Sequence, residues 1–258
     1  PLHAILEQQQ ISFDQMTVTA RTSPDEGLFL DADLVNLMQD TTRIDTVCFI
    51  ARQDSLGIRY DTRIVKKPFR KQQPFTAGVN GHIRNTFADA ELRYLNGKGE
   101  TGILIGFRLG KEPDGFRLHL FPEHPVLAFR PFQLNPDNYI LYRNLNDIAA
   151  DVRLTGEENA SLWIHSEAEG KRMEEIHAEL SQINLQALSE GFPNLPALRG
   201  MLNANLQYAP SDSNFLVVAD AYIDNLFYEG ERVGELVFNG VYLPTDKQGH
   251  QIDAHFFR

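Results

Sequence analysis

Hydrophobic and polar residues alternate one by one along most of this chain, and few stretches have the spacing of an amphipathic helix. The segments 88–94 and 202–208 are examples, reading Ala-Asp-Ala-Glu-Leu-Arg-Tyr and Leu-Asn-Ala-Asn-Leu-Gln-Tyr. Because successive side chains of a β-strand point to opposite faces, each such segment has one apolar and one polar side. The pattern predicts a sheet with an apolar face, and the functional question is what covers that face.

The same alternation predicts strands from one end of the sequence to the other. We expect them at 17–20, 28–34, 44–52, 58–64, 75–83, 88–94, 103–109, 116–120, 139–142, 148–154, 160–164, 176–183, 202–208, 215–223, 233–242 and 252–257. One short helix is predicted at 185–189, with Asn184 as its N-cap and Gly191 as its end. Asn96 and Gly97 predict a hairpin with a type I′ turn.

Four prolines, at 122, 125, 131 and 136, interrupt the series of strands. Proline cannot donate a hydrogen bond to a strand ladder, so this passage is expected at an edge or in a connection. We therefore expect β-rich segments at 1–121 and 139–258, joined by a Pro-rich connection at 122–138 and continuous with one another. The predicted class is all-β and antiparallel, with at most one or two short helices.

Alternation alone leaves open a sandwich, a barrel, a propeller and a curled open sheet. In a curled sheet the apolar face lines an elongated hydrophobic groove, whereas in a sandwich the same side chains form the core between two layers. The residues expected on that face are Ile58, Tyr60, Val79, Ile83, Leu92, Ile105, Phe107, Leu118, Leu120, Val152, Leu154, Leu162, Ile164, Leu206, Val217, Ile223, Phe238 and Tyr242.

The charge and cysteine content narrow the classes of function. The net charge of −11, from 35 acidic and 24 basic residues, argues against a nucleic-acid surface, which needs clustered cations. The single cysteine, Cys48, rules out an intramolecular disulfide, and its apolar neighbours predict a small buried side chain. No apolar run is long enough for a membrane-spanning helix. Since both ends fall where a longer chain would continue, we expect this sequence to be a fragment.

Residues that could support chemistry are scattered. Asp31 and Asp33 share one side of a predicted strand, where solvated carboxylates are common, and the histidines show no metal-binding spacing. No nucleophile, phosphate-loop or dinucleotide motif is present. We expect no catalytic residue, metal or cofactor. Trp163 is expected on the face opposite Leu162 and Ile164. The basic run at 66–71 is expected either as a solvated loop or in contact with lipid headgroups.

The last third of the chain contains three motifs in a fixed order. A strand running into a short helix is expected at 176–185 and is followed by Leu-x-Gly-x-Leu-x-Ala at 198–204. The segment 225–236 then reads Asn-Leu-x-Tyr, then Gly, then Gly-x-Leu. In this order the motifs resemble the TamB branch of the AsmA-like family of bacterial envelope proteins, and the last one is similar to the family's hairpin. The stretches 132–136 and 162–166 are also similar, whereas residues before about 120 share only the style of strand after strand.

This resemblance implies an antiparallel sheet curled into a long apolar groove. It further implies a periplasmic segment of a protein anchored in the inner membrane outside this sequence. The implied role is to shield the acyl chains of phospholipid during transport between inner and outer membranes, or to assist outer-membrane protein assembly. The implied partners are phospholipid and, through other parts of the protein, an Omp85-type barrel, TamA.

Two other classes of function remain open from the residues themselves. A compact β-sandwich could serve as a structural or adhesive module that binds protein or glycan. A carboxylate-based glycoside hydrolase would need two acids about 5–10 Å apart in a cleft, and the sequence indicates no such pair.

Overall fold

The computed structural model describes residues 11–24, 27–39, 42–70, 72–166, 175–191, 195–211, 214–245 and 249–257. Nearly all of these residues lie in strands, which form one open antiparallel sheet, as the alternation predicted. The chain divides into two compact units, residues 1–108 and 109–258, which are described separately below.

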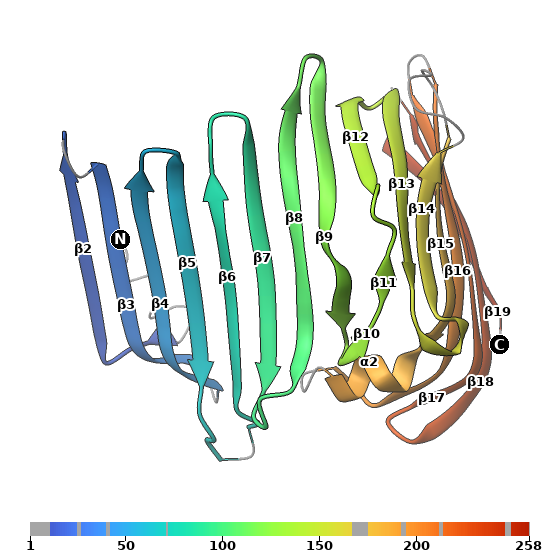
Figure 1. The fold of residues 1–258 in the computed structure, drawn as a ribbon. Helices are drawn as coiled ribbons and strands as arrows, with labels where there is room; N and C mark the ends of the chain where they lie inside the picture. The colour runs from blue at the N-terminus through green and yellow to red at the C-terminus, as the bar shows by residue number, and fades with distance from the viewer. Residues whose placement is uncertain are drawn as a thin grey trace. The chain divides into compact units, whose positions relative to one another are not determined.

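The first unit is built from strands that follow one another in the chain. They are β1 (Ile11–Ser12), β2 (Gln15–Ser23), β3 (Gly27–Gln39), β4 (Thr42–Asp54), β5 (Gly57–Lys66), β6 (Phe75–Ile83) and β7 (Phe87–Asn96). From β2 to β7 each strand pairs with the next one in antiparallel register, and β1 pairs with the end of β3. Figure 1 shows β2 to β7 side by side. The following strand, β8 (Thr101–Glu112), runs from this unit into the second.

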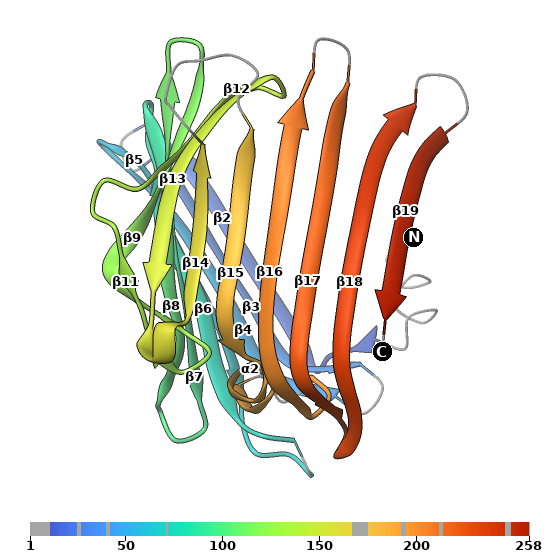
Figure 2. The ribbon, with the colours of Figure 1, turned by 90° about the vertical axis from the view of Figure 1, so that its right-hand side faces the viewer.

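The second unit continues with further strands and one short helix. Its elements are β9 (Gly115–Leu127), β10 (Arg130–Pro131), β11 (Gln133–Leu134), β12 (Tyr139–Asn144), β13 (Asp147–Thr155), η1 (Glu157–Asn159), β14 (Ser161–Ser166), β15 (Ile176–Asn184), α2 (Leu185–Gly191), β16 (Leu198–Pro210), β17 (Phe215–Tyr228), β18 (Glu231–Thr245) and β19 (Gly249–Phe257). β12 pairs with β9 and β13, and the strands from β13 to β19 pair in chain order. Figure 2 shows β14 to β19 side by side.

Every predicted strand lies within or overlaps a strand of the structure, although the observed strands are mostly longer. The Pro-rich passage contains more regular structure than expected, because β9 continues to Leu127 and the short strands β10 and β11 follow. The division between the compact units falls at Arg108 and Leu109, before this passage. The passage at 122–138 therefore belongs wholly to the second unit.

The turn after β7 differs from the predicted type. A hairpin forms, but the Asn96 carbonyl accepts a hydrogen bond from the Gly99 amide at 2.9 Å, and its side-chain Oδ1 accepts from the amides of Lys98 and Glu100. Of the residues in this turn, Gly99 alone has a positive φ, of 81°. The type I′ prediction is wrong because Asn96 organises a longer loop through its side chain.

The predicted helix and its cap are confirmed. Asn184 Oδ1 accepts hydrogen bonds from the amides of Gln186 at 3.0 Å and Ala187 at 3.2 Å, both in the first turn of the helix. The helix α2 lies at one end of strands β15 and β16 (Figures 1 and 2). Ser189 Oγ donates to the Leu198 carbonyl and ties the helix to the start of β16.

The second unit contains a small packed core. Leu134, Val152 and Leu154 are 1%, 1% and 2% exposed. Partly buried neighbours packed against them are Leu120, Leu127, Phe132, Ile140, Leu162 and Ile164. The buried Asn138 fixes the connection between β11 and β12 beside β9, because its side chain bonds to both the amide and the carbonyl of Leu120. These bonds replace the ladder that an ordinary strand would form here.

Bulges interrupt the register of neighbouring strands in the second unit. The pairing of β15 with β16 shifts between Leu180 and Ile183, where Gln182 has a φ of 51°. The pairing of β16 with β17 shifts at Gly200, which has a φ of 133°. A bulge inserts one residue and bends the strand, so these positions bend adjacent strands.

Candidate functional site

Strand register places the apolar side chains of the first unit on one face of its sheet. Directly paired residues of an antiparallel sheet share a face. One such row runs from Phe49 through Thr62 and Val79 to Leu92. The next row contains Tyr60, and the row after it pairs Ile58 with Ile83. The predicted residues Ile58, Tyr60, Val79, Ile83 and Leu92 therefore lie on one face, which we call the first apolar face.

The contacts of Arg108 place the start of β8 in the same arrangement. Its guanidinium lies 3.8 Å from the Asp89 carboxylate and 5.0 Å from the centroid of the Phe87 ring. Both of these residues are on the opposite, polar face, since they alternate with Ala88 and Ala90 in β7. Ile105 and Phe107, which alternate with Arg108, thus lie on the side of the first apolar face.

Large apolar side chains on this face remain partly in contact with solvent. Met16 is 55% exposed, Val18 53%, Ile83 49%, Phe107 45% and Leu92 38%. The buried apolar members of the face are small, with Ala51 at 6% and Ala90 at 4% exposed. The core of a closed sandwich would bury its largest side chains first. Exposure of the large ones instead leaves apolar surface that can bind something.

The second unit has its own apolar face, defined by the same reasoning. One row runs from Val152 through Ile164, Ala178 and Leu206 to Ala219. Adjacent rows on this side hold the remaining predicted residues, which are Leu118, Leu154, Leu162, Val217, Ile223, Phe238 and Tyr242. We call this the second apolar face. It too includes exposed residues, with Leu206 at 43%.

Part of the second apolar face is covered by the chain itself. Val152 and Leu154 belong to the core with Leu134 and retain no free surface, so the prediction that they line an open groove is wrong for these two residues. Leu120, Leu162 and Ile164 pack against that core and are only partly accessible. The short strand β11 lies in the sheet beside β13 and places Leu134 directly opposite Leu154, and Phe132 packs against the same cluster.

The bulge at Gln182 preserves the second apolar face. Without an extra residue, strand alternation would place Ile183 on the side opposite Leu180. Because the register shifts between them, Leu180 pairs with Ala204 and Ile183 with Leu202, which share one side of β16. The bulge therefore keeps both side chains on the apolar face.

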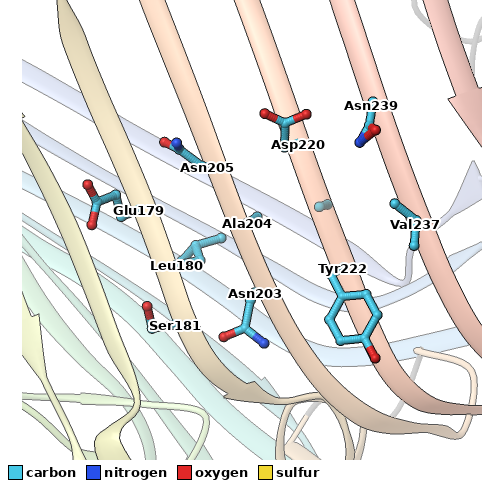
Figure 3. A pocket seen from close by; sticks show the side chains of 11 residues that line it. Glu179, Leu180, Ser181, Asn203, Ala204, Asn205, Asp220, Tyr222, Val237 and Asn239 are labelled. Atoms are coloured by element: carbon cyan, nitrogen blue, oxygen red, sulfur yellow. The ribbon is translucent and has the colours of Figure 1, made fainter.

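The opposite face of the second unit is polar and slightly hollowed. Figure 3 shows the hollow, which crosses β15 to β18 and whose polar row is Glu179, Asn205, Asp220 and Asn239. Tyr222 lies beside this row and is 37% exposed. The hollow is therefore open, with a row of four polar side chains and with Tyr222 and Val237 beside that row.

Trp163 lies on this polar face, as the alternation predicted. Its ring stacks on His165 at 3.8 Å between centroids, and the Arg153 guanidinium is 5.5 Å from its ring centroid. His165 Nε2 is 3.4 Å from a Glu179 carboxylate oxygen. The tryptophan is thus held by polar neighbours across β13 to β15 and is separate from the apolar face.

Cys48 does not have the predicted surroundings. Register pairs it with Asp33 and Arg63, so it lies half-buried on the polar face of the first unit. The hydrogen bond to the Asp33 carboxylate is the main cause, and partial burial the second, of a Cys48 thiol pKa raised to about 11. Asp31 lies on the same face, consistent with the expected solvated strand side. At neutral pH this thiol is protonated and a poor nucleophile.

The described parts of the chain contain neither a cluster of metal-binding side chains nor a membrane-spanning helix. Among these residues, no group of three or more His, Cys, Asp or Glu side chains is placed to hold a metal ion. None of the helices in the described ranges has the length and apolar character needed to cross a bilayer.

Comparisons with protein families, with curated proteins and with solved structures find no match to this chain. The physical character of the two apolar faces is therefore the basis for inferring a function.

Proposed function

We propose that this chain is a non-enzymatic segment that shields the acyl chains of lipids on its apolar sheet faces. The observation that carries the proposal is the register, which gathers apolar side chains from successive strands on one face while large members such as Val18 and Ile83 stay about half exposed. The polar residues of the same strands lie on the other face. Such one-sided strands suit a surface that contacts hydrocarbon on one side and water on the other.

The energetics of this role are favourable without a closed pocket. Each CH₂ group left in water costs about 0.8 kcal/mol, so a sixteen-carbon acyl chain costs on the order of 10 kcal/mol. The strand rise of about 3.4 Å gives the path from Ile58 to Lys66 along β5 a length of about 27 Å. That length exceeds the roughly 15 Å of hydrocarbon in one leaflet. An acyl chain can therefore lie along a strand of the first apolar face.

The biological setting we propose follows the resemblance to the TamB branch of the AsmA-like family. In that setting the chain is a periplasmic part of an inner-membrane-anchored envelope protein and assists phospholipid transport to the outer membrane or outer-membrane protein assembly. An Omp85-type barrel would be contacted by other parts of the full-length protein. No catalytic residue takes part in this role.

Site-specific photo-crosslinking tests the proposal with matched neighbours. A photoreactive amino acid at Val79 or Leu206 would lie on an apolar face, whereas the adjacent positions Asn80 and Asn205 lie on the polar faces. We expect lipid adducts at Val79 and Leu206, detected by mass spectrometry of protein purified from bacterial cells, and none at the polar pair. Equal labelling at all of these positions, or no lipid at any, would contradict the proposal.

A further inference from the structure

A lysine ends the first apolar face. Lys66 is the last residue of β5 and lies on the same side as Ile58, Tyr60 and Ile64. It is only 9% exposed, and its ammonium lies 5.6 Å from the centroid of the Phe75 ring. Within the described ranges it forms no ion pair. A shielded cation without an anionic partner is energetically unfavourable, and the aromatic ring offsets only part of that.

The nearest carboxylate in register is already engaged. Asp45, 6% exposed, accepts a hydrogen bond from the Arg43 guanidinium at 2.6 Å and another from the backbone amide of Lys67 at 2.7 Å. Arg43 also donates to Asn36 Oδ1 at 3.0 Å. Its Nε is nevertheless buried without a hydrogen-bond partner in the described structure. Among the described residues, this end of the face thus holds an ammonium without an ion pair and a buried guanidinium N–H without an acceptor.

The adjoining loop adds further positive charge. The guanidinium groups of Arg43 and Arg70 are each 5.1 Å from the centroid of the Phe69 ring. Lys67 and Arg70 are exposed. The Arg43–Asp45 pair is therefore bonded to the start of a short loop segment that, with Lys66, contains three further cations, in a chain whose net charge is −11. The sequence left two interpretations of the basic run at 66–71, a solvated loop or a contact with lipid headgroups. In the structure, Lys66 connects this run to the first apolar face.

The other end of the same face carries no charge. Its last row consists of Thr22, Leu28, Gln53, Ile58, Ile83 and Ala88. Between the two ends, the row of Ile64 is apolar, and Phe75 contacts Tyr94 with ring centroids 5.5 Å apart. The first apolar face therefore has a direction, with cations at one end and hydrocarbon along its length.

We propose that Lys66, supported by Arg43 and Lys67, binds the phosphate of an anionic phospholipid whose acyl chain lies along β5 and β6. This inference rests on the proposed function and adds the class of lipid and its orientation. The phosphate would supply the counter-ion that Lys66 lacks among the described residues. Charge-assisted hydrogen bonds to phosphate are among the stronger polar contacts in proteins.

The test compares lipids that differ only in the headgroup. The intact chain is titrated with phosphatidylglycerol and with a diacylglycerol that has the same acyl chains, and binding is followed by displacement of a fluorescent diacylglycerol. We expect phosphatidylglycerol to bind about tenfold more tightly, as one charge-assisted hydrogen bond would provide. Equal affinities would overturn this inference while leaving the proposed function intact. If neither lipid binds, the proposed function fails as well.

Variants at Lys66 locate the preference. Lys66→Gln should reduce the headgroup preference to less than twofold, whereas Lys66→Arg should retain it. Lys98→Gln removes the same charge from the exposed loop after β7 and should leave it unchanged. Persistence of the preference in Lys66→Gln, or its loss in Lys98→Gln, would overturn the assignment. If Lys66→Gln does not fold, the comparison of the two lipids on the unaltered chain still decides.

Inorganic phosphate separates a headgroup site from a simple anion site. Because the acyl chain supplies most of the proposed binding free energy, phosphate should not displace phosphatidylglycerol even at a hundredfold excess. Displacement by equimolar phosphate would show that the site binds free phosphate and would overturn the lipid assignment.

Discussion

The apolar side chains of the alternating strands are packed differently in the two units. In the second unit, Leu134, Val152 and Leu154 are almost completely buried, and Leu134 of β11 lies directly opposite Leu154 of β13. In the first unit, the buried apolar residues are the small Ala51 and Ala90, and larger ones such as Val18 remain exposed. Buried leucines stabilise a fold, whereas exposed ones leave surface for a ligand. The comparison separates a region that supplies stability from one suited to binding.

Polar residues mark where each apolar surface ends. In the second unit, Asn138 satisfies the backbone of Leu120 and lets the connection approach the core closely. In the first unit, Lys66 occupies the corresponding kind of boundary but forms no ion pair with any described residue. A satisfied amide suits a permanent contact within the chain, and an unsatisfied cation suits a partner that comes and goes.

The largest expected effect is on the stability of the second unit. Leu154→Ala should reduce the free energy of unfolding by about 3 kcal/mol, because it leaves a cavity in a packed core. Leu206→Ala, at a residue that is 43% exposed, should cost less than about 1 kcal/mol. Urea denaturation followed by the fluorescence of Trp163, the single tryptophan, measures both. Equal losses would show that the contrast between core and open face is wrong.

A second change concerns binding by the first apolar face. Leu92→Lys should weaken the binding of a fluorescent diacylglycerol about tenfold, because an acyl chain would have to desolvate the new ammonium. The matched change Glu91→Lys lies on the polar face and alters the charge by more, yet it should leave binding unchanged. Displacement titrations measure both affinities. A stronger effect at Glu91 than at Leu92 would place the lipid on the polar face and contradict the proposal.

A third and smaller change tests the end of the sheet in the second unit. Asn184→Ala should lower the free energy of unfolding by about 1 kcal/mol, since the amides of Gln186 and Ala187 lose their acceptor. Asn184→Asp keeps a capping oxygen and should remain within about 0.3 kcal/mol of the natural chain. The same denaturation experiment applies. A loss in the aspartate variant equal to that in the alanine variant would argue against capping as the cause.

The sequence predicts the strands well because their signal is local. The segment 75–83, for example, coincides with β6, since alternation needs only neighbouring residues. Burial of Val152 was not predictable, because it depends on packing with Leu134, which the pairing of β11 with β13 brings into the same cluster. Cys48 sits in a continuous apolar run, so only its pairing with Asp33 and Arg63 reveals that it faces the polar side.

Irregular pairing marks a second limit of prediction from sequence. The bulge at Gln182 has no local signal, yet it decides whether Ile183 joins the apolar face. Lys66 reads as the start of a solvated basic loop, and its role at the boundary emerges only from its register with Ile58 and Ile64 along β5. The sites that sequence reasoning missed therefore depend on contacts between distant segments.

The smallest expected effect on stability, at pH 7, comes from the polar face of the first unit. Asp33→Asn puts an uncharged amide in place of the negatively charged acceptor that, with burial, raises the Cys48 pKa to about 11. A raised thiol pKa destabilises the fold only as pH rises above the unfolded pKa of about 8.5 towards the folded value, so at pH 7 unfolding should change by less than about 0.5 kcal/mol. The change should instead appear in the pH profile of alkylation by iodoacetamide, whose midpoint should move down from about 11. Asp31→Asn, a carboxylate on the same face without that hydrogen bond, should move it much less, and equal shifts would contradict the assignment to Asp33.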